Sequence, residues 1–220
     1  MDIKAITFDL DMTLIDFMKF KRRGSDAAAN AMTKTGFKVD KDELFKFYMH
    51  DIEGDTVFGE FLKSKNNYSE RILAAGINAY LKEKHKHLQT YPGVKKTLLK
   101  LKELGFKIVL ITDAPRLKAF MRLDSLGIAE LFDIVVGFED TGTRKPSQLP
   151  FEKALKLLNL KPSQAMHVGD WPERDILGAK EVGMKTCLAE YGWNSHKLGK
   201  WIEPDYKIKT FEDIVSIVNV

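Results

Sequence analysis

The sequence predicts an α/β protein in which a parallel sheet with flanking helices carries an inserted, all-helical subdomain. From about residue 92 onward, short apolar runs of strand type alternate with longer segments of helical periodicity, which is typical of βαβ units. Between the first strand and residue 92 the pattern contains helices only. We therefore expect one domain formed by residues 1–16 and 92–220, interrupted by a helical insertion at residues 17–91.

The core elements follow from apolar spacing and from turn residues. The first strand is expected in the apolar run before Asp9. The segment 94–105, VKKTLLKLKELG, repeats apolar residues at helical spacing and stops at Gly105, where glycine favours a helix end. The later strands are expected at 107–112, 133–137, 165–169, 184–189 and 205–208, and the later helices at 115–126, 150–158, 174–182 and 211–218.

The insertion shows four stretches of helical pattern. They are DAAANAMTKTG (26–36), KDELFKFYMHDI (41–52), TVFGEFLKS (56–64) and SERILAAGINAYLKEKHKHL (69–88).

The composition limits the classes of protein that are compatible with this chain. With 220 residues, 44% of them hydrophobic, the chain can bury a sizeable core. Its longest apolar runs, such as IVLI at 108–111, are far shorter than the roughly 18–20 residues that cross a bilayer. No signal-peptide pattern precedes the first strand, so we expect a cytoplasmic protein without a membrane partner.

Charge and cysteine content narrow the chemistry further. The net charge of +4 is spread among many lysines and glutamates, so nucleic acid is not an expected partner, whereas a small anionic ligand is compatible. Cys187, the single cysteine, stands in the apolar stretch MKTCLA and is expected to be a buried, inert thiol. Redox chemistry is therefore not expected.

Two aspartates follow the first strand in KAITFDLDMTLID, residues 4–16. Side chains alternate along an extended chain, so Asp9 and Asp11 are expected on the same side. Two carboxylates about 4 Å apart repel each other by roughly 4 kcal/mol at an effective dielectric constant near 20. A positive charge is therefore expected between them, unless the strand simply ends in a solvated polar turn.

Other strand ends carry matching chemistry. Thr112 and Asp113 end one predicted strand, and Asp170 follows another, with Asp175 five residues later. Lys145 lies in a loop expected at the same edge of the sheet. Taken singly, these residues also fit helix caps or solvated side chains. Because the carboxyl ends of parallel strands meet at one edge, however, the set is expected to converge on a ligand site.

Together these motifs resemble the haloacid dehalogenase-like hydrolase superfamily, a group of phosphotransferases with a Rossmann-like core. The matching segments are DLDMT at 9–13, ITD at 111–113, the lysine of RKP at 145 and GDWPERD at 169–175. The insertion resembles the cap domain of the phosphoglycolate phosphatase and β-phosphoglucomutase branch. The resemblance thus implies that residues 1–16 and 92–220 form a Rossmann-like catalytic core and that residues 17–91 form a helical cap.

The resemblance also implies catalytic roles. Asp9 would be the nucleophile that becomes an aspartyl phosphate, and Asp11 would be the general acid and base. Lys145 would neutralise Asp9 and the transferring phosphoryl group. Thr112, together with the backbone N–H groups of Asp113 and Ala114, would hold the phosphoryl oxygens beside Lys145.

Mg²⁺ is the cofactor that the resemblance implies. Its ligands would be the Asp9 carboxylate, the Asp11 backbone carbonyl and Asp170, with Asp175 as a further ligand or next to one.

A phosphatase is the favoured function, because phosphatases and phosphomutases of the superfamily use a carboxylic acid at Asp11 whereas dehalogenases and phosphonatases do not. A phosphomutase is the alternative. A phospho-receiver domain would lack the long helical insertion, and a binding-only module would show no metal-dependent turnover. The expected substrate is a small sugar or acid phosphate, such as glyceraldehyde 3-phosphate or phosphoglycolate. The protein is expected to be a monomer or a homodimer.

Substrate selection is expected to depend on the helical insertion. Its first residues form a basic cluster that could contact a second anionic group or could be a solvated helix face; the cluster is Lys19, Lys21, Arg22 and Arg23. Met12 and Trp171 depart from the residues common in relatives, and neither they nor the segment 193–201, with Trp193 and Trp201, receives a role from the sequence.

Overall fold

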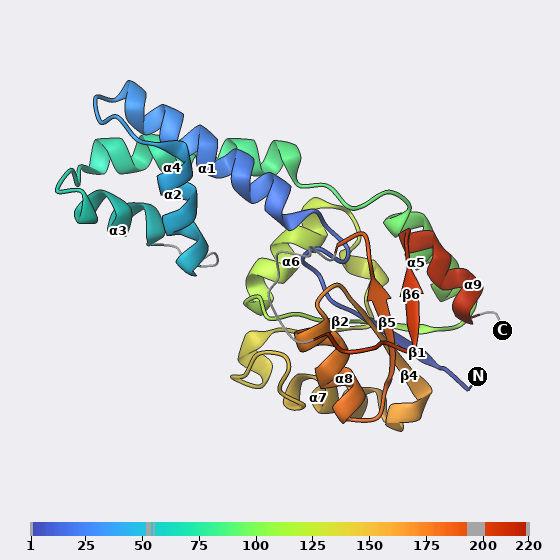
Figure 1. The fold of residues 1–220 in the computed structure, drawn as a ribbon. Helices are drawn as coiled ribbons and strands as arrows, with labels where there is room; N and C mark the ends of the chain where they lie inside the picture. Colours follow the sequence, from blue (N-terminus) through green and yellow to red (C-terminus); the bar gives the residue numbers. More distant parts are fainter. Residues whose placement is uncertain (1, 52–53, 55, 193–200, 219–220) are drawn as a thin grey trace. The chain divides into compact units, whose positions relative to one another are not determined.

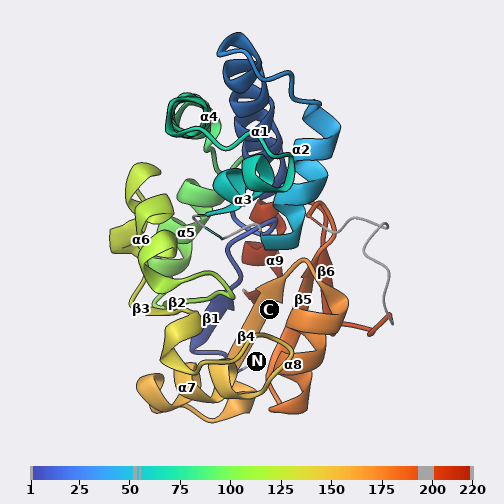
Figure 2. The same ribbon diagram turned by 90° about the vertical axis from the view of Figure 1, so that its left-hand side faces the viewer.

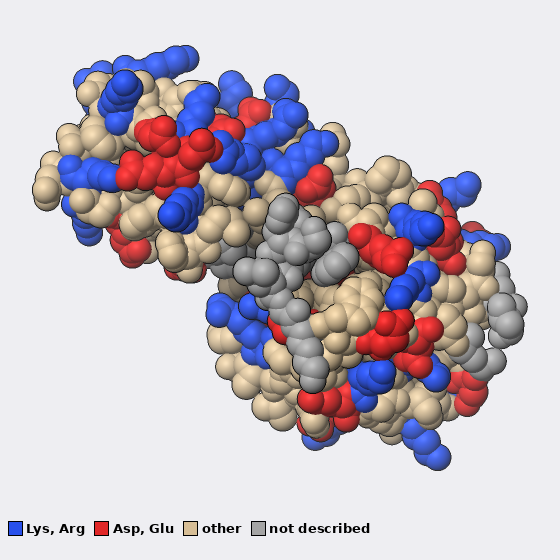
Figure 3. Space-filling model, viewed as in Figure 1, with Lys and Arg blue, Asp and Glu red and all other residues tan. Residues whose placement is uncertain are grey.

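The structure is a computed structural model that describes residues 2–51, 54, 56–192 and 201–218. The chain forms two compact units: Met1–Asp16 with Gln89–Val220, and Phe17–Leu88. Within the described residues, no helix has the length and apolarity needed to cross a membrane. Acidic and basic side chains intermix over the visible surface of both units (Figure 3).

The first unit is built on a six-stranded sheet in the order β3-β2-β1-β4-β5-β6, in which every strand pair is parallel (Figure 1). The predicted α/β fold is therefore confirmed. The central strand β1 pairs Ala5 with both Lys107 of β2 and Ala165 of β4, so the carboxyl ends of these three strands are level. The strands are β1 Ala5–Phe8, β2 Lys107–Ile111, β3 Ile134–Val136, β4 Ala165–Gly169, β5 Lys185–Ala189 and β6 Tyr206–Ile208.

Helices cover both faces of this sheet, which explains why β1 is buried along its whole length. On one face, Ala5, Val109 and Ile111 share a core cluster with helices α7 and α8. On the other face, the rings of Phe8 and Phe211 pack with their centroids 5.4 Å apart, and Phe211 lies just before α9 in the chain. Figure 2 shows helices on both sides of the sheet. The helices of this unit are α5 Val94–Glu103, α6 Arg116–Ser125, α7 Leu149–Leu158, α8 Leu177–Glu181 and α9 Ile214–Val218.

Most predicted core elements lie within two residues of their expected bounds, and α5 ends just before Gly105, whose φ of 87° is the left-handed conformation that glycine accommodates. The helix expected at 174–182 is different. Residues Pro172–Ile176 form a π-helical turn that continues into α8. Its wider winding carries Asp175, so the departure from regular geometry lies at the predicted ligand site.

The described residues of the second unit contain helices and no strand. The first helix begins at Phe17, so the expected start at residue 26 is wrong. Gly24 and Ser25 favour a break in the sequence pattern, but a Cβ at Gly24 would lie 2.6 Å from the ring of Tyr80. Close packing of α1 on α4 therefore favours glycine inside a helix. The helices are α1 Phe17–Lys34, α2 Lys41–Tyr48, α3 Val57–Ser64 and α4 Glu70–His87.

Two helical glycines of this unit provide a matched test of that packing. We expect Gly24→Ala to lower the free energy of unfolding by about 1–2 kcal/mol, because the clash with Tyr80 outweighs the gain in helix propensity. In Gly59→Ala of α3, the new Cβ would make only ordinary contacts, the nearest at 3.6 Å. This substitution should raise the free energy of unfolding by about 0.5–1 kcal/mol. Urea unfolding of both variants measures the difference, and stabilisation by both would contradict the packing role of Gly24.

Candidate active site

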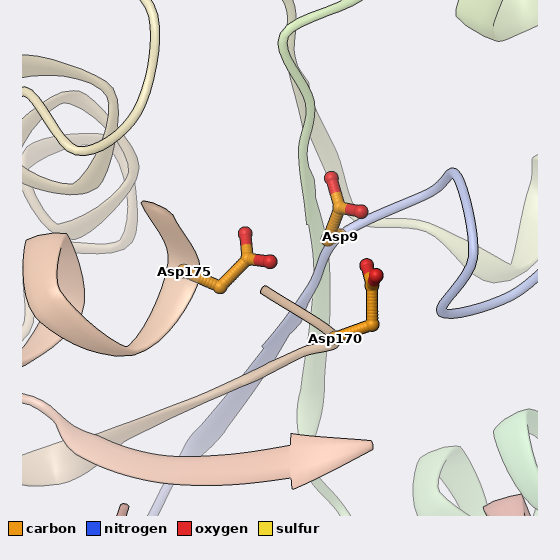
Figure 4. A group of neighbouring side chains, drawn as sticks. All are labelled: Asp9, Asp170 and Asp175. Atoms are coloured by element: carbon orange, nitrogen blue, oxygen red, sulfur yellow. The ribbon is translucent and has the colours of Figure 1, made fainter. Parts of the chain in front are cut away.

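Three buried carboxylates converge at the carboxyl ends of β1 and β4. Asp9 follows β1 directly, Asp170 follows β4, and Asp175 lies in the π-helical turn beyond it. One oxygen from each carboxylate lies within 4.8 Å of the others, and Figure 4 shows the three side chains pointing toward one another. Oxygen donors at this spacing suit a hard divalent cation such as Mg²⁺.

Lys145 supplies a positive charge to this group. Its Nζ donates to Asp9 Oδ1 at 2.5 Å and to Asp175 Oδ1 at 2.7 Å, and a third hydrogen bond reaches the carbonyl of Ile111 at 3.1 Å. The Lys145 side chain is only 3% exposed. All three ammonium protons are therefore directed at protein oxygens, which fixes the cation between two of the carboxylates.

Burial and charge act in opposite directions on the pKa values of these groups. Burial raises the pKa of the Asp9 carboxyl well above its ordinary value; Lys145 opposes this, while Asp175, Asp170 and Asp11 add to it. Burial alone would raise the pKa of Asp175, but Lys145 and the hydrogen bond from His167 outweigh it and lower that pKa. The same carboxylates raise the pKa of Lys145 against its own burial. Lys145 therefore stays protonated beside the carboxylates.

A fully buried polar network lies behind Asp175. His167, on β4, has its Nε2 3.4 Å from Asp175 Oδ1 and its Nδ1 2.8 Å from Thr7 Oγ1 on β1. Burial lowers the pKa of His167 below its ordinary value, which favours the neutral ring. No sequence pattern distinguishes Thr7 or His167, because each stands within an apolar strand.

The loop after β2 is tied to the loop that carries Lys145. The backbone N–H of Lys145 donates to Asp113 Oδ1 at 2.9 Å, and Arg174 Nη1 lies 3.3 Å from Asp113 Oδ2. Thr112 Oγ1 accepts the backbone N–H of Ala114 at 3.2 Å. Thr112 and Ala114 are buried, and Asp113 holds the Lys145 loop through its carboxylate.

Asp11 does not share the cation that serves Asp9. Both of its carboxylate oxygens accept from Arg122 Nη1 of α6, at 3.0 and 2.9 Å. Arg122 was not predicted from the sequence, although a signal was present: Ala119 and Leu123 mark the buried face of α6, and Arg122 occupies a position on that face. A buried arginine requires a partner of opposite charge, and the Asp11 carboxylate is one.

Met12 forms a tight turn between the first strand and the next segment. Its φ is 71°, an uncommon conformation for a residue other than glycine. Its N–H donates to the carbonyl of Ile15 at 2.8 Å. A Cβ at Gly192 would lie 1.7 Å from the Met12 carbonyl oxygen, so this turn is packed against a backbone that has no room for a side chain. Thr13, the next residue, donates from Oγ1 to Asp170 Oδ1 at 3.3 Å.

Trp171 positions Asp175 through its backbone. Its N–H donates to Asp175 Oδ2 at 2.9 Å, and its carbonyl accepts the N–H of Asp175 at 2.7 Å. The guanidinium of Arg174 lies 4.3 Å from the centre of the Trp171 ring, a cation–π contact. Trp193 lies outside the described residues, whereas Trp201 is exposed and donates to Glu203.

The basic cluster lies on α1 of the second unit, and its members differ. Lys21 is buried at 3% exposure, with its Nζ 2.6 Å from Tyr48 Oη and 5.0 Å from the centre of the Phe17 ring. A solvated face is therefore wrong for Lys21. Arg22 pairs with Asp26 and Asp42, and Arg23 and Lys19 are exposed. A contact between this cluster and substrate stays a prediction.

Comparisons with known proteins identify the family and the fold of the chain. Residues 6–189 match the family model described as haloacid dehalogenase-like hydrolase. The chain is 36% identical to glyceraldehyde 3-phosphate phosphatase of Pyrococcus furiosus, over 97% of this chain and 88% of that protein. It is 31% identical to phosphoglycolate phosphatase of Aquifex aeolicus, over 99% and 97% of the two chains. The structure of the HAD hydrolase YfnB of Bacillus subtilis, bound to magnesium, shares the fold with a TM-score of 0.70 at 20% identity, over 99% of each chain.

Metal binding by the three carboxylates can be measured through stability. We expect Mg²⁺ at ten times its Kd to raise the free energy of unfolding by about 1.4 kcal/mol, because it binds the folded chain alone. Asp170→Asn removes one charge from the group and should abolish most of this increase. Asp124→Asn removes an exposed carboxylate from α6 and should leave it intact. Thermal unfolding with and without Mg²⁺ reports both, and an unchanged response in Asp170→Asn would contradict the site.

Proposed function

Because the chain belongs to the haloacid dehalogenase-like hydrolase family, as its four sequence motifs predicted, we propose that it is a Mg²⁺-dependent phosphatase that forms an aspartyl-phosphate intermediate. The predicted enzyme class, a phosphatase of this family, is confirmed by homologues of that name. The substrate proposed is a small phosphorylated metabolite.

The contact that carries this proposal is the one between Lys145 and Asp9. A buried carboxylate whose Oδ1 is held at 2.5 Å from an ammonium group is oriented by one oxygen, which leaves Oδ2 for attack on phosphorus. The same ammonium group lies where negative charge accumulates as the phosphoryl group transfers. Asp9 is thus the proposed nucleophile, and Lys145 stabilises the transition state.

The remaining residues divide the other tasks. Thr112 and the N–H groups of Asp113 and Ala114 are proposed to bind the phosphoryl oxygens in the loop before α6. The Asp9 and Asp170 carboxylates, the Asp11 backbone carbonyl and Asp175 would hold Mg²⁺, which when bound supplies charge neutralisation to the phosphoryl oxygens. Asp175 also stays hydrogen-bonded to Lys145, which ties the metal group to the nucleophile.

Asp11 is proposed to move protons in both halves of the reaction. In the first half, Asp9 Oδ2 forms a bond to phosphorus, the ester bond breaks, and a proton from Asp11 goes to the leaving oxygen. In the second half, water attacks phosphorus, its proton goes to Asp11, and the Asp9–phosphorus bond breaks to release phosphate. The proton returned in the second half restores the group that donates in the first.

For the substrate, we propose glyceraldehyde 3-phosphate, with phosphoglycolate as the next candidate. The support comes from the relatives of those names, which match this chain over 97% and 99% of its length. Residues of the helical insertion, including the basic cluster on α1, are proposed to select among leaving groups. A phosphomutase with the same two aspartates would instead return an isomeric phosphate and require a bisphosphate activator.

The nucleophile assignment is tested by hydrolysis of p-nitrophenyl phosphate with and without Mg²⁺, followed by a panel of metabolite phosphates. We expect metal-dependent release of inorganic phosphate by the wild type. Asp9→Asn should lose at least about 10³-fold in kcat/KM, because covalent transfer has no alternative acceptor. Asp124→Asn is the matched control and should retain activity. Hydrolysis that survives in Asp9→Asn would rule out this phosphatase mechanism.

The role of Asp11 as an acid predicts a dependence on the leaving group. An alkyl leaving oxygen needs a proton as it departs, whereas p-nitrophenolate does not. Asp11→Asn should therefore lower kcat/KM for an alkyl phosphate by about 10²–10⁴-fold and that for p-nitrophenyl phosphate far less. Equal losses for the two substrates would show that Asp11 does not donate the proton.

A further inference from the structure

Arg122 is a buried cation at a core position of α6. Its side chain is 2% exposed, which makes it one of the largest fully buried side chains among the described residues. Its neighbours on the same helix face, Ala119 and Leu123, have no exposed surface. A leucine would satisfy the packing at this position without the cost of burying a charge, so the arginine requires an explanation beyond the core.

Arg122 contacts a carboxylate in the centre of the proposed site. Nη1 lies 3.0 Å from Asp11 Oδ1 and 2.9 Å from Oδ2, nearly the same distance from both oxygens. A charged donor placed between the two oxygens makes a charge-assisted contact with each of them and restrains the position of the carboxylate. Asp11 is 23% exposed at its side chain, so its carboxylate is held from the protein side and still reaches solvent.

The two buried cations serve different carboxylates. Lys145 contacts Asp9 and Asp175, while Arg122 contacts Asp11. A Mg²⁺ ion held by this group would add two positive charges to those of Lys145 and Arg122, which would balance the four carboxylates of Asp9, Asp11, Asp170 and Asp175. The nucleophile and the proton carrier are thus held by separate groups from separate elements, a loop for Lys145 and α6 for Arg122.

We propose that Arg122 is a positioning residue that holds the Asp11 carboxylate for the second half of the reaction, in which the aspartyl phosphate is hydrolysed. This inference rests on the function proposed above. In that step the Asp11 carboxylate accepts a proton from the attacking water as the water oxygen bonds to phosphorus, and the Asp9–phosphorus bond breaks.

This placement predicts a separation between two kinetic constants. With p-nitrophenyl phosphate, kcat/KM reports transfer to Asp9, because release of p-nitrophenolate ends the first half and needs no proton. By contrast, kcat includes hydrolysis of the intermediate. We expect Arg122→Met to lower kcat by about 10–100-fold and to leave kcat/KM within about 3-fold of the wild-type value. The expected loss of kcat is a part of the roughly 10²–10⁴-fold that general acid–base catalysis contributes.

A pre-steady-state measurement gives a second readout of the same step. If hydrolysis of the intermediate slows, Arg122→Met should release a burst of p-nitrophenolate approaching one equivalent per enzyme, followed by slow turnover. Arg122→Lys keeps the positive charge but places it on a more flexible side chain, so its kcat should lie between those of Arg122→Met and the wild type. In an Asp11→Asn background, Arg122→Met should cause no further loss of kcat, since its effect passes through Asp11.

Leu123→Ala is the matched structural control. It truncates the adjacent buried side chain of α6, so any loosening of the helix should affect kcat and kcat/KM together, without a burst. The inference would be overturned if Arg122→Met lowered both constants equally, showed no burst, or added its loss to that of Asp11→Asn. Wild type without metal-dependent hydrolysis would instead overturn the proposed function, and this inference with it.

Discussion

The structure around the candidate site depends on the need to compensate carboxylates that are buried close together. Asp9, Asp170 and Asp175 bring oxygens within 4.8 Å of one another in a region from which water is largely excluded. Such a group is stable only if cations and hydrogen-bond donors face it. The Lys145 ammonium group donates all three of its hydrogen bonds here, to Asp9, to Asp175 and to the carbonyl of Ile111.

The fold fixes the positions of these carboxylates and of the groups that compensate their charge. Level carboxyl ends of β1 and β4 place Asp9 beside Asp170, and the π-helical turn brings Asp175 back toward both. Backbone groups of Trp171 and the ring of His167 hold Asp175 from behind. Because these supports lie on strands and on a turn anchored to them, the carboxylates are oriented before any ligand binds, which is the arrangement that favours electrostatic catalysis.

Sequence patterns were reliable where a local rule decides the structure. Apolar periodicity and glycine stops placed the sheet strands and most of their helices, because burial and turn conformation depend on near neighbours. The start of α1 was wrong because the pattern could not show that Gly24 faces the ring of Tyr80, 56 positions away along the chain. The prediction that Lys21 lies on a solvated helix face was wrong for the same reason, since its ammonium group contacts Tyr48 and Phe17.

By itself, the sequence determined the α/β class, the family and the set of polar residues at strand ends, because strand alternation and parallel topology are encoded in short segments. Only the tertiary structure decided how charge is distributed among them. Lys145 bridges Asp9 and Asp175, whereas Asp11 pairs with Arg122, 111 positions away in the chain. Pairing between distant residues follows from helix and sheet packing in three dimensions, and a one-dimensional pattern does not contain that information.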